Sequence, residues 1–199
     1  MKLQLPNVTL FGIDAHDPKG LEYAAEVCLS KVDFGAVKII TDHNYYRGRV
    51  GYSRFCIEKM NEFVQTDYVL IIHPDGYIQN ESAWDDNWLK YDYIGAVWDW
   101  YNKNLVGNGG FSLRSKKLLN ILSNLDVSDI DVHPEDDFIC RKIRNWLELE
   151  YDIKFAPVEV AKLFSIEGYG LKPTYNVYRG EFGFHGRYVS NLPIPIKKV

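Results

Sequence analysis

Short apolar runs alternate with helical patterns in the first half of the chain. The runs Val8–Ile13, Ala36–Thr41 and Tyr68–Ile72 are rich in aliphatic, often β-branched residues, as in strands that are covered on both faces. The first gap carries apolar residues at helical spacing from Leu21 onward, and in the second gap Ser53 is expected to cap a helix. Three strand-then-helix units predict an α/β domain with a mainly parallel central sheet flanked by helices.

The second half of the chain has a more mixed pattern. Its Gly-, Pro- and Tyr-rich tail from Gly168 predicts loop and edge structure. The other expected elements are strands at Tyr93–Val97 and Gly110–Arg114, a helix at Ser115–Leu122, a helix with Pro134 in its first turn that runs to about Leu149, and a short strand at Ile153–Ala156. We therefore interpret residues 1–199 as one domain. The end of the chain carries no recognisable stop signal, so this domain can be the N-terminal part of a longer protein.

Composition narrows the class of protein. The 199 residues are 46% hydrophobic and 25% charged, the balance of a globular domain with a real core. A net charge of −4 disfavours a nucleic-acid binder, and no apolar stretch approaches the ~18 residues of a membrane span. The start of the chain reads as a strand and not as a signal peptide. Because Cys28, Cys56 and Cys140 are far apart and show no zinc spacing, we expect free thiols and a cytoplasmic location.

Aspartates stand directly after the three predicted strands of the first half. Asp14, Asp42 and Asp75 would gather at one rim of a parallel sheet, where ligands of such sheets bind. Three converging carboxylates need a cation or a donor-rich ligand. The alternative is that each aspartate only begins a turn or caps a helix. That alternative is the better one for a single aspartate, whereas three at corresponding places slightly favour a site.

The segment LIIHPDGYIQN gives the sharpest signal at this rim. A hydrophobic strand delivers Asp75, and Gly76 allows a close approach of the backbone. One carboxylate there would suit Mg²⁺ or Mn²⁺ held jointly with diphosphate oxygens. Arg54 at the start of the Ser53 helix would pair with phosphate or with a rim aspartate, or would be an ordinary surface arginine. The chain has neither GxGxxG nor GxxxxGK[ST], which weakens dinucleotide and P-loop interpretations.

Three later segments carry further candidate residues. In VGNGGFSLRS, Gly109 and Gly110 would let backbone amides approach a ligand, although a plain hairpin explains the pattern better. In HPEDD, Glu135 or Asp136 would deprotonate an acceptor hydroxyl, or would only stabilise a helix N-terminus. In FGFHG, His185 is explained equally well as a metal ligand and as a structural histidine.

Two other kinds of side chain are weaker candidates. His73 and His133 each precede a proline and suit turns. Large aromatic side chains mostly fill cores, but Trp98 and Trp100 lie next to the candidate loops and are the best candidates to stack on a sugar ring.

Several strings in order resemble one family of proteins. They are LPNVTLFGID, TDYVLIIHPDGYIQN, YDYIGAVW, VGNGGFSLRS, HPEDDFICR, KFAPVEVAKLFSIE and FGFHG, over roughly residues 6 to 187. Together they resemble the small GT-A glycosyltransferase-like domains of bacterial sugar loci and chlorella viruses, most closely the viral members. The combination of VGNGGFSLRS with HPED is specific, whereas the strand that ends at Asp75 is a weak signal alone.

The resemblance implies a GT-A fold, a UDP-sugar donor and Mn²⁺ or Mg²⁺. The acidic metal motif of the family falls on His73–Tyr77, which departs from the usual DxD because only Asp75 is acidic. His185 matches a C-terminal histidine that often completes the metal shell. The remaining residues implied by the resemblance are the nucleoside contacts Ile13, Asp14, Ala15 and Asp42, the sugar-facing wall Gly109, Gly110 and Phe111, and the catalytic candidates Glu135 and Asp136.

The sequence-based hypothesis is a metal-dependent glycosyltransferase. It would move a hexose or deoxyhexose from a UDP-sugar to a hydroxyl of a glycan acceptor, with Ser53 and Arg54 beside the diphosphate and Arg54 assisting catalysis. For a viral chain the compartment would be the host cytoplasm. The alternatives are a glycoside hydrolase, which also uses paired carboxylates, and a non-catalytic sugar-binding module.

Overall fold

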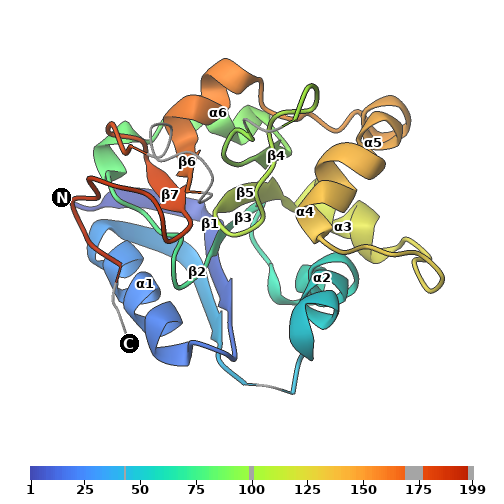
Figure 1. The fold of residues 1–199 in the computed structure, drawn as a ribbon, viewed down its shortest axis with the longest axis horizontal. Helices are drawn as coiled ribbons and strands as arrows, with labels where there is room; N and C mark the ends of the chain where they lie inside the picture. The colour runs from blue at the N-terminus through green and yellow to red at the C-terminus, as the bar shows by residue number, and fades with distance from the viewer. Residues whose placement is uncertain (43, 99–100, 169–176, 197–199) are drawn as a thin grey trace.

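A five-stranded sheet runs through the middle of the molecule (Figure 1). The computed structural model describes residues 1–42, 44–98, 101–168 and 177–196. The strands, in their order across the sheet, are β2 (Val32–Ile40), β1 (Leu3–Ile13), β3 (Tyr68–Ile72), β5 (Ser112–Ser115) and β4 (Tyr93–Ile94). β1 pairs in parallel with β2 and β3, while β5 runs antiparallel to β3 and β4. All strands but β5 therefore point the same way, which confirms the predicted α/β fold with a mostly parallel sheet.

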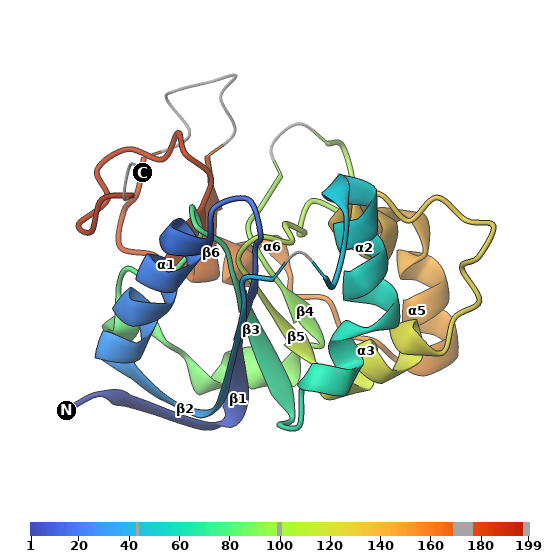
Figure 2. The same cartoon turned by 90° about the horizontal axis from the view of Figure 1, so that it is seen from below.

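Both faces of the central strands β1 and β3 are covered, as their apolar runs predicted, whereas the edge strand β2 leaves Val37 exposed. Leu10 of β1 packs with Leu21 on one face, and the next residue, Phe11, packs with Phe55 on the other. In Figure 2, helix α1 (Pro18–Lys31) lies on the first side, and α2 (Gly48–Glu58) and α3 (Lys116–Ser123) lie on the second. The carboxyl ends of β2, β1 and β3 consequently form one rim between the two helix layers.

Side chains at the helix starts explain two of the boundaries. Asp17 accepts a hydrogen bond from the amide of Gly20 at 2.9 Å, and Pro18 occupies the first position of α1. Ser115 accepts one from the amide of Leu118 at 3.0 Å and so begins α3 directly after β5. The prediction for Ser53 was wrong, because α2 begins at Gly48 and Ser53 lies buried inside that helix.

The helix expected from Pro134 to about Leu149 is interrupted. It consists of α4 (Glu135–Asp137), a π-helical turn (Phe138–Lys142) and α5 (Arg144–Tyr151). Ile143, with φ −108° and ψ 3°, separates the last two. The strand expected near Ile153 is reduced to a single bridge between Phe155 and Tyr93.

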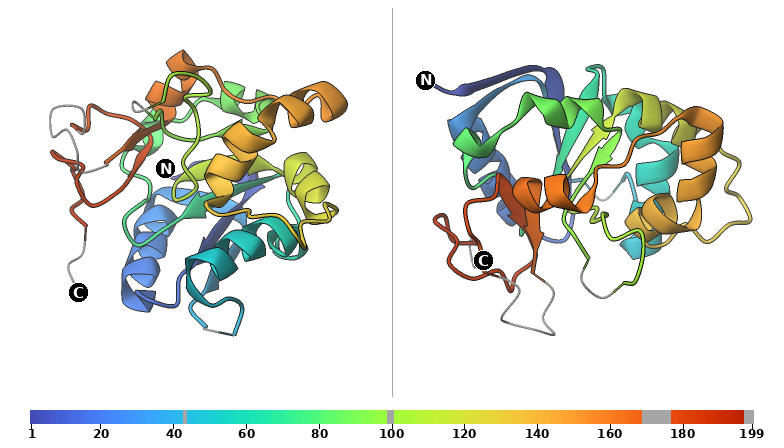
Figure 3. Two further views of the ribbon diagram at one scale, coloured as in Figure 1. Left: turned by 45° about the vertical axis from the view of Figure 1, so that its right-hand side comes forward. Right: turned by 90° about the horizontal axis from the view of Figure 1, so that it is seen from above.

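A second, two-stranded parallel sheet lies beside the main one (Figure 3). Helix α6 (Val158–Phe164) leads directly into β6 (Ser165–Glu167), which pairs with β7 (Gly183–His185). A bridge from Ile78 to Gly183 joins this pair to the chain that follows β3. The tail from Gly168 was predicted as loop and edge structure, and no strand was predicted at Ser165–Glu167 or at Gly183–His185. Both strands are therefore findings of the structure.

Two properties expected from composition can be compared with the structure. Cys28, Cys56 and Cys140 are all buried, and none of them forms a disulfide. In the ranges that the structure describes, no helix combines the length and apolar character needed to cross a membrane.

Candidate functional site

A tight turn at the end of β3 presents Asp75 at the rim. His73 and Gly76 exchange backbone hydrogen bonds of 2.9 and 3.0 Å, which closes the turn His73-Pro74-Asp75-Gly76. The amide of Gly186 donates to the carbonyl of Asp75 at 2.8 Å. The end of β7 is thereby fastened to the turn, although more than one hundred residues separate the two in sequence.

Three side chains converge where the turn and β7 meet. His73, Asp75 and His185 each offer a ligand atom, and these atoms lie within 4.8 Å of one another; we call them the His–Asp cluster. Nε2 of His185 lies 3.7 Å from Oδ1 of Asp75. This separation is too long for a hydrogen bond, but it is close to the spacing of two ligands that bind one cation at about 2.1 Å each.

Outer partners hold both imidazoles in place. Glu167 lies opposite His185 in the β6–β7 register, and its carboxylate oxygens are 3.3 Å from Nδ1 of His185. The Tyr52 hydroxyl lies 2.7 Å from Nε2 of His73. Each ring is therefore oriented through one nitrogen, which is the usual arrangement around metal-binding histidines.

The two histidines differ in charge. Burial disfavours a charged His185 ring, but the neighbouring Glu167 and Asp75 carboxylates outweigh it and raise the pKa of His185 to about 9. Burial and the adjacent His185 lower the pKa of His73 well below its usual range. His73 is therefore neutral at pH 7, and His185 would exchange its proton for a bound cation.

The donor chemistry of the cluster fits a divalent metal ion. A carboxylate and two imidazoles are common ligands of such ions, and the described residues place no ammonium group within salt-bridge distance of Asp75. The nearest guanidinium, that of Arg187, has Nε 3.8 Å from Oδ2 of Asp75 and a side chain that is 70% exposed. An ion bound there would face solution at the rim of the sheet.

Glycines allow the close packing around this cluster. A Cβ at Gly110 would lie 2.1 Å from Nε2 of His185, and one at Gly76 would lie 2.9 Å from the carbonyl oxygen of Gly110. The predicted purpose of Gly110, to bring an amide to a ligand, stays untested. In this structure its amide donates to Oδ1 of Asn108 at 2.9 Å, and its lack of a side chain makes room for His185.

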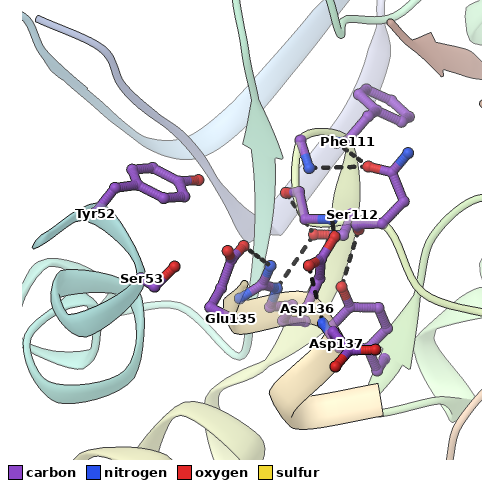
Figure 4. Close-up of polar contacts among 12 residues, drawn as sticks. Tyr52, Ser53, Phe111, Ser112, Glu135, Asp136 and Asp137 are labelled. Carbon is purple, nitrogen blue, oxygen red and sulfur yellow. Dashed lines mark hydrogen bonds and ion pairs between the residues drawn. The ribbon is translucent and has the colours of Figure 1, made fainter. Parts of the chain in front are cut away.

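A second group of carboxylates lies at the start of α4 (Figure 4). Glu135 is buried and pairs with the buried Arg114 at 3.3 Å, while Asp136 accepts from the amide of Gly109 at 2.9 Å. Burial, followed by the charge of Asp136, raises the pKa of Glu135, and Arg114 partly offsets this rise. The structure thus places HPEDD beside the glycine-rich segment, as a shared site requires.

The other two rim aspartates serve local turns. Oδ1 of Asp14 accepts from the amides of His16 and Asp17 at 2.7 and 2.9 Å, and Asp42 accepts from Asn44 in the same way at 2.9 Å. Each therefore begins a turn, which is the alternative set out above. Their predicted nucleoside contacts, with those of the buried Ile13 and Ala15, stay predictions.

Three further candidates have their observed contacts with residues outside the His–Asp cluster. Arg54 pairs with Glu58 and donates to carbonyl oxygens of the segment 127–130, so its guanidinium fixes that loop. Ser53 lies within hydrogen-bond distance of Nδ1 of His133, at 2.9 Å. The Phe111 ring is fully buried and stacks on Phe164, so it packs in the core, and its predicted place in the wall near the transferred sugar stays a prediction.

Aromatic stacking on a sugar is not supported for Trp98. The Trp98 ring is buried and packs directly against Gly107. A Cβ added at Gly107 would lie only 2.1 Å from a ring atom. Trp100 lies outside the described residues.

Sequence reasoning missed the outer partners of the cluster and underrated His73. His73 was ranked as a weaker candidate because a proline follows it, yet the HPD spacing puts it on the same tight turn as Asp75. Tyr52 and Glu167 gave no local signal, because they reach the site through the packing of α2 and the pairing of β6 with β7.

Comparison with known families assigns the chain to one protein family. A family model described as a protein of unknown function, DUF5672, matches residues 36–185. The chain belongs to this family. No curated protein is similar enough in sequence to this DUF5672 member to count as a relative.

Solved structures that share the fold of this DUF5672 domain include that of a viral enzyme. It is the crystal structure of a glycosyltransferase involved in the glycosylation of the major capsid of PBCV-1, with a TM-score of 0.57 over 89% of this chain and 91% of that one. The two sequences are 11% identical. The expected resemblance to the viral enzymes is therefore one of fold, and the expectation of a close match was wrong.

Proposed function

We propose that this DUF5672 domain is a metal-dependent glycosyltransferase that uses a UDP-sugar donor. The observation that carries the proposal is the His–Asp cluster at the carboxyl ends of the parallel strands, where ligands of such sheets bind. The fold shared with the PBCV-1 glycosyltransferase supports the same reaction class. The transferred group would be a hexose or deoxyhexose, and the acceptor a glycan hydroxyl.

Asp75 and His185 would hold Mn²⁺ or Mg²⁺ at the rim. The ion would supply charge neutralisation to the diphosphate leaving group. The HPDG turn and β7 hold these two ligands together, since the amide of Gly186 is bonded to the Asp75 carbonyl. The loops after β1 and β2, with Ile13, Asp14, Ala15 and Asp42, would contact the nucleoside.

The start of α4 would face the acceptor. Asp136 is partly exposed and Glu135 is buried, so we assign the interaction with the acceptor hydroxyl to Asp136. The Glu135–Arg114 pair would position α4, and the amide of Gly109 would orient the Asp136 carboxylate.

Release of UDP from UDP-sugars with MnCl₂ tests the proposal. The unmodified chain should release UDP, and Asp75→Asn should lose nearly all of this turnover. Asp126→Asn, which changes an exposed loop aspartate, is the matched control and should behave as the unmodified chain. Turnover by Asp75→Asn at the control rate would contradict the metal role.

The same assay separates the alternatives. Cleavage of oligosaccharides without UDP or metal would indicate a glycoside hydrolase. Glycan binding without turnover, and without thermal stabilisation by UDP and Mn²⁺, would indicate a binding module.

A further inference from the structure

The His–Asp cluster contains more nitrogen than oxygen donors. Asp75 supplies its one carboxylate, and His73 and His185 supply two imidazoles. The ring centroids of the two histidines are 5.5 Å apart, with the rings nearly perpendicular at 71°. Asp75 is the one acidic residue of the segment His73–Tyr77, on which the motif implied by the resemblance falls.

Each imidazole keeps one nitrogen for a cation. The Tyr52 hydroxyl lies 2.7 Å from Nε2 of His73, which leaves Nδ1 of that ring for a cation. Glu167, 3.3 Å from Nδ1 of His185, leaves Nε2, the nitrogen that faces Asp75 at 3.7 Å. Outer partners on both histidines would fix the rings and strengthen them as ligands.

We propose that His73 is a third metal ligand and that the site selects Mn²⁺, Co²⁺ or Zn²⁺ against Mg²⁺. The inference rests on the cation of the proposed function and specifies its class. Mg²⁺ binds oxygen ligands in a near-ideal octahedron and keeps several waters, whereas imidazole suits first-row transition metals. Two imidazoles beside one carboxylate therefore disfavour Mg²⁺, with or without a nucleotide.

Metal competition on the unmodified chain tests the selectivity. Bound Mn²⁺, followed by electron paramagnetic resonance, should resist about a hundredfold excess of MgCl₂ and should be displaced by ZnCl₂ at similar concentration. Nitrogen hyperfine modulation of the bound Mn²⁺ should report two imidazoles. Displacement by equimolar MgCl₂, or modulation from fewer than two imidazoles, would overturn the inference.

Variants at His73 test the ligand itself. His73→Ala should weaken Mn²⁺ binding at least about tenfold, and His73→Asp should let Mg²⁺ compete. Glu150→Ala, on the exposed surface of α5, is the control and should leave binding unchanged. Thermal unfolding without metal checks that each variant folds; if His73→Ala does not, the hyperfine measurement on the unmodified chain decides.

The outcomes also separate this inference from the proposed function. Absence of any Mn²⁺ binding, with and without UDP, overturns both. Metal-dependent UDP release that Mg²⁺ supports equally, and that His73→Asp does not alter, overturns only the role of His73.

Discussion

Side chains that touch no cation directly set the geometry of the proposed site. Glu167 has no part in the HPDG turn, yet its carboxylate lies 3.3 Å from the outer nitrogen of His185. The glycine at position 110 acts by lacking a side chain, because a Cβ there would occupy the place of the His185 ring. Both residues can therefore be tested apart from the ligands.

Glu167→Gln removes the charge that orients His185 and keeps the size of the side chain. Outer partners of metal-binding histidines typically contribute 10–100-fold to affinity, so we expect Mn²⁺ to bind about tenfold more weakly. Titration calorimetry measures this directly. Glu159→Gln on the exposed surface of α6 is the control, and an equal affinity in the two variants would remove Glu167 from the site.

Gly110→Ala should destabilise the fold and weaken Mn²⁺ binding together. The new methyl group would overlap the His185 ring, and such overpacking costs about 1–3 kcal/mol. Gly51→Ala inside α2 meets its nearest atom at 3.5 Å and should stabilise by about 0.5–1 kcal/mol. Urea unfolding of the two variants gives the comparison; a neutral Gly110→Ala would mean that His185 moves aside freely.

At the scale of elements, the buried Arg114–Glu135 pair joins β5 to α4. Removal of one partner from a buried ion pair leaves the other charge uncompensated and typically costs about 3–5 kcal/mol. Arg114→Met should therefore lower the free energy of unfolding by about that amount. Arg49→Ala on the exposed side of α2 should change it little.

The cost of Arg114→Met should depend on pH. Burial raises the pKa of Glu135, so the folded state holds that proton more tightly than the unfolded chain. Stability from this group is present at low pH and is lost as pH rises through the raised pKa. Without Arg114 the pKa rises further, so the cost should be larger at pH 8 than at pH 5. Urea unfolding at both values would contradict this if the cost were the same or smaller at pH 8.

The elements also show what sequence patterns predict and what they miss. Tyr68–Ile72 was predicted with its observed bounds, because a buried strand between polar turns is a local signal. The break at Ile143 and the three-residue strands β6 and β7 were missed. Such short strands show no periodicity, and pairing across distant segments creates them, so no local pattern predicts that Glu167 meets His185.

At the scale of the whole molecule, the order of strands determines which candidate residues can meet. The sequence predicted one rim for Asp14, Asp42 and Asp75, and β2, β1 and β3 are indeed neighbours. Only Asp75 among these three joins the His–Asp cluster, because only its turn is joined to β7. The predicted pairing of Asp75 with His185 required that contact, which the resemblance implied and local pattern did not.

A crystal soaked with UDP and MnCl₂, with anomalous data collected near the manganese edge, tests the central claim most directly. We expect one strong anomalous peak about 2.1–2.3 Å from Asp75 and His185, with the diphosphate of UDP on its open side. A peak at another place, or UDP bound with the Asp75 carboxylate turned away and no peak beside it, would contradict the account.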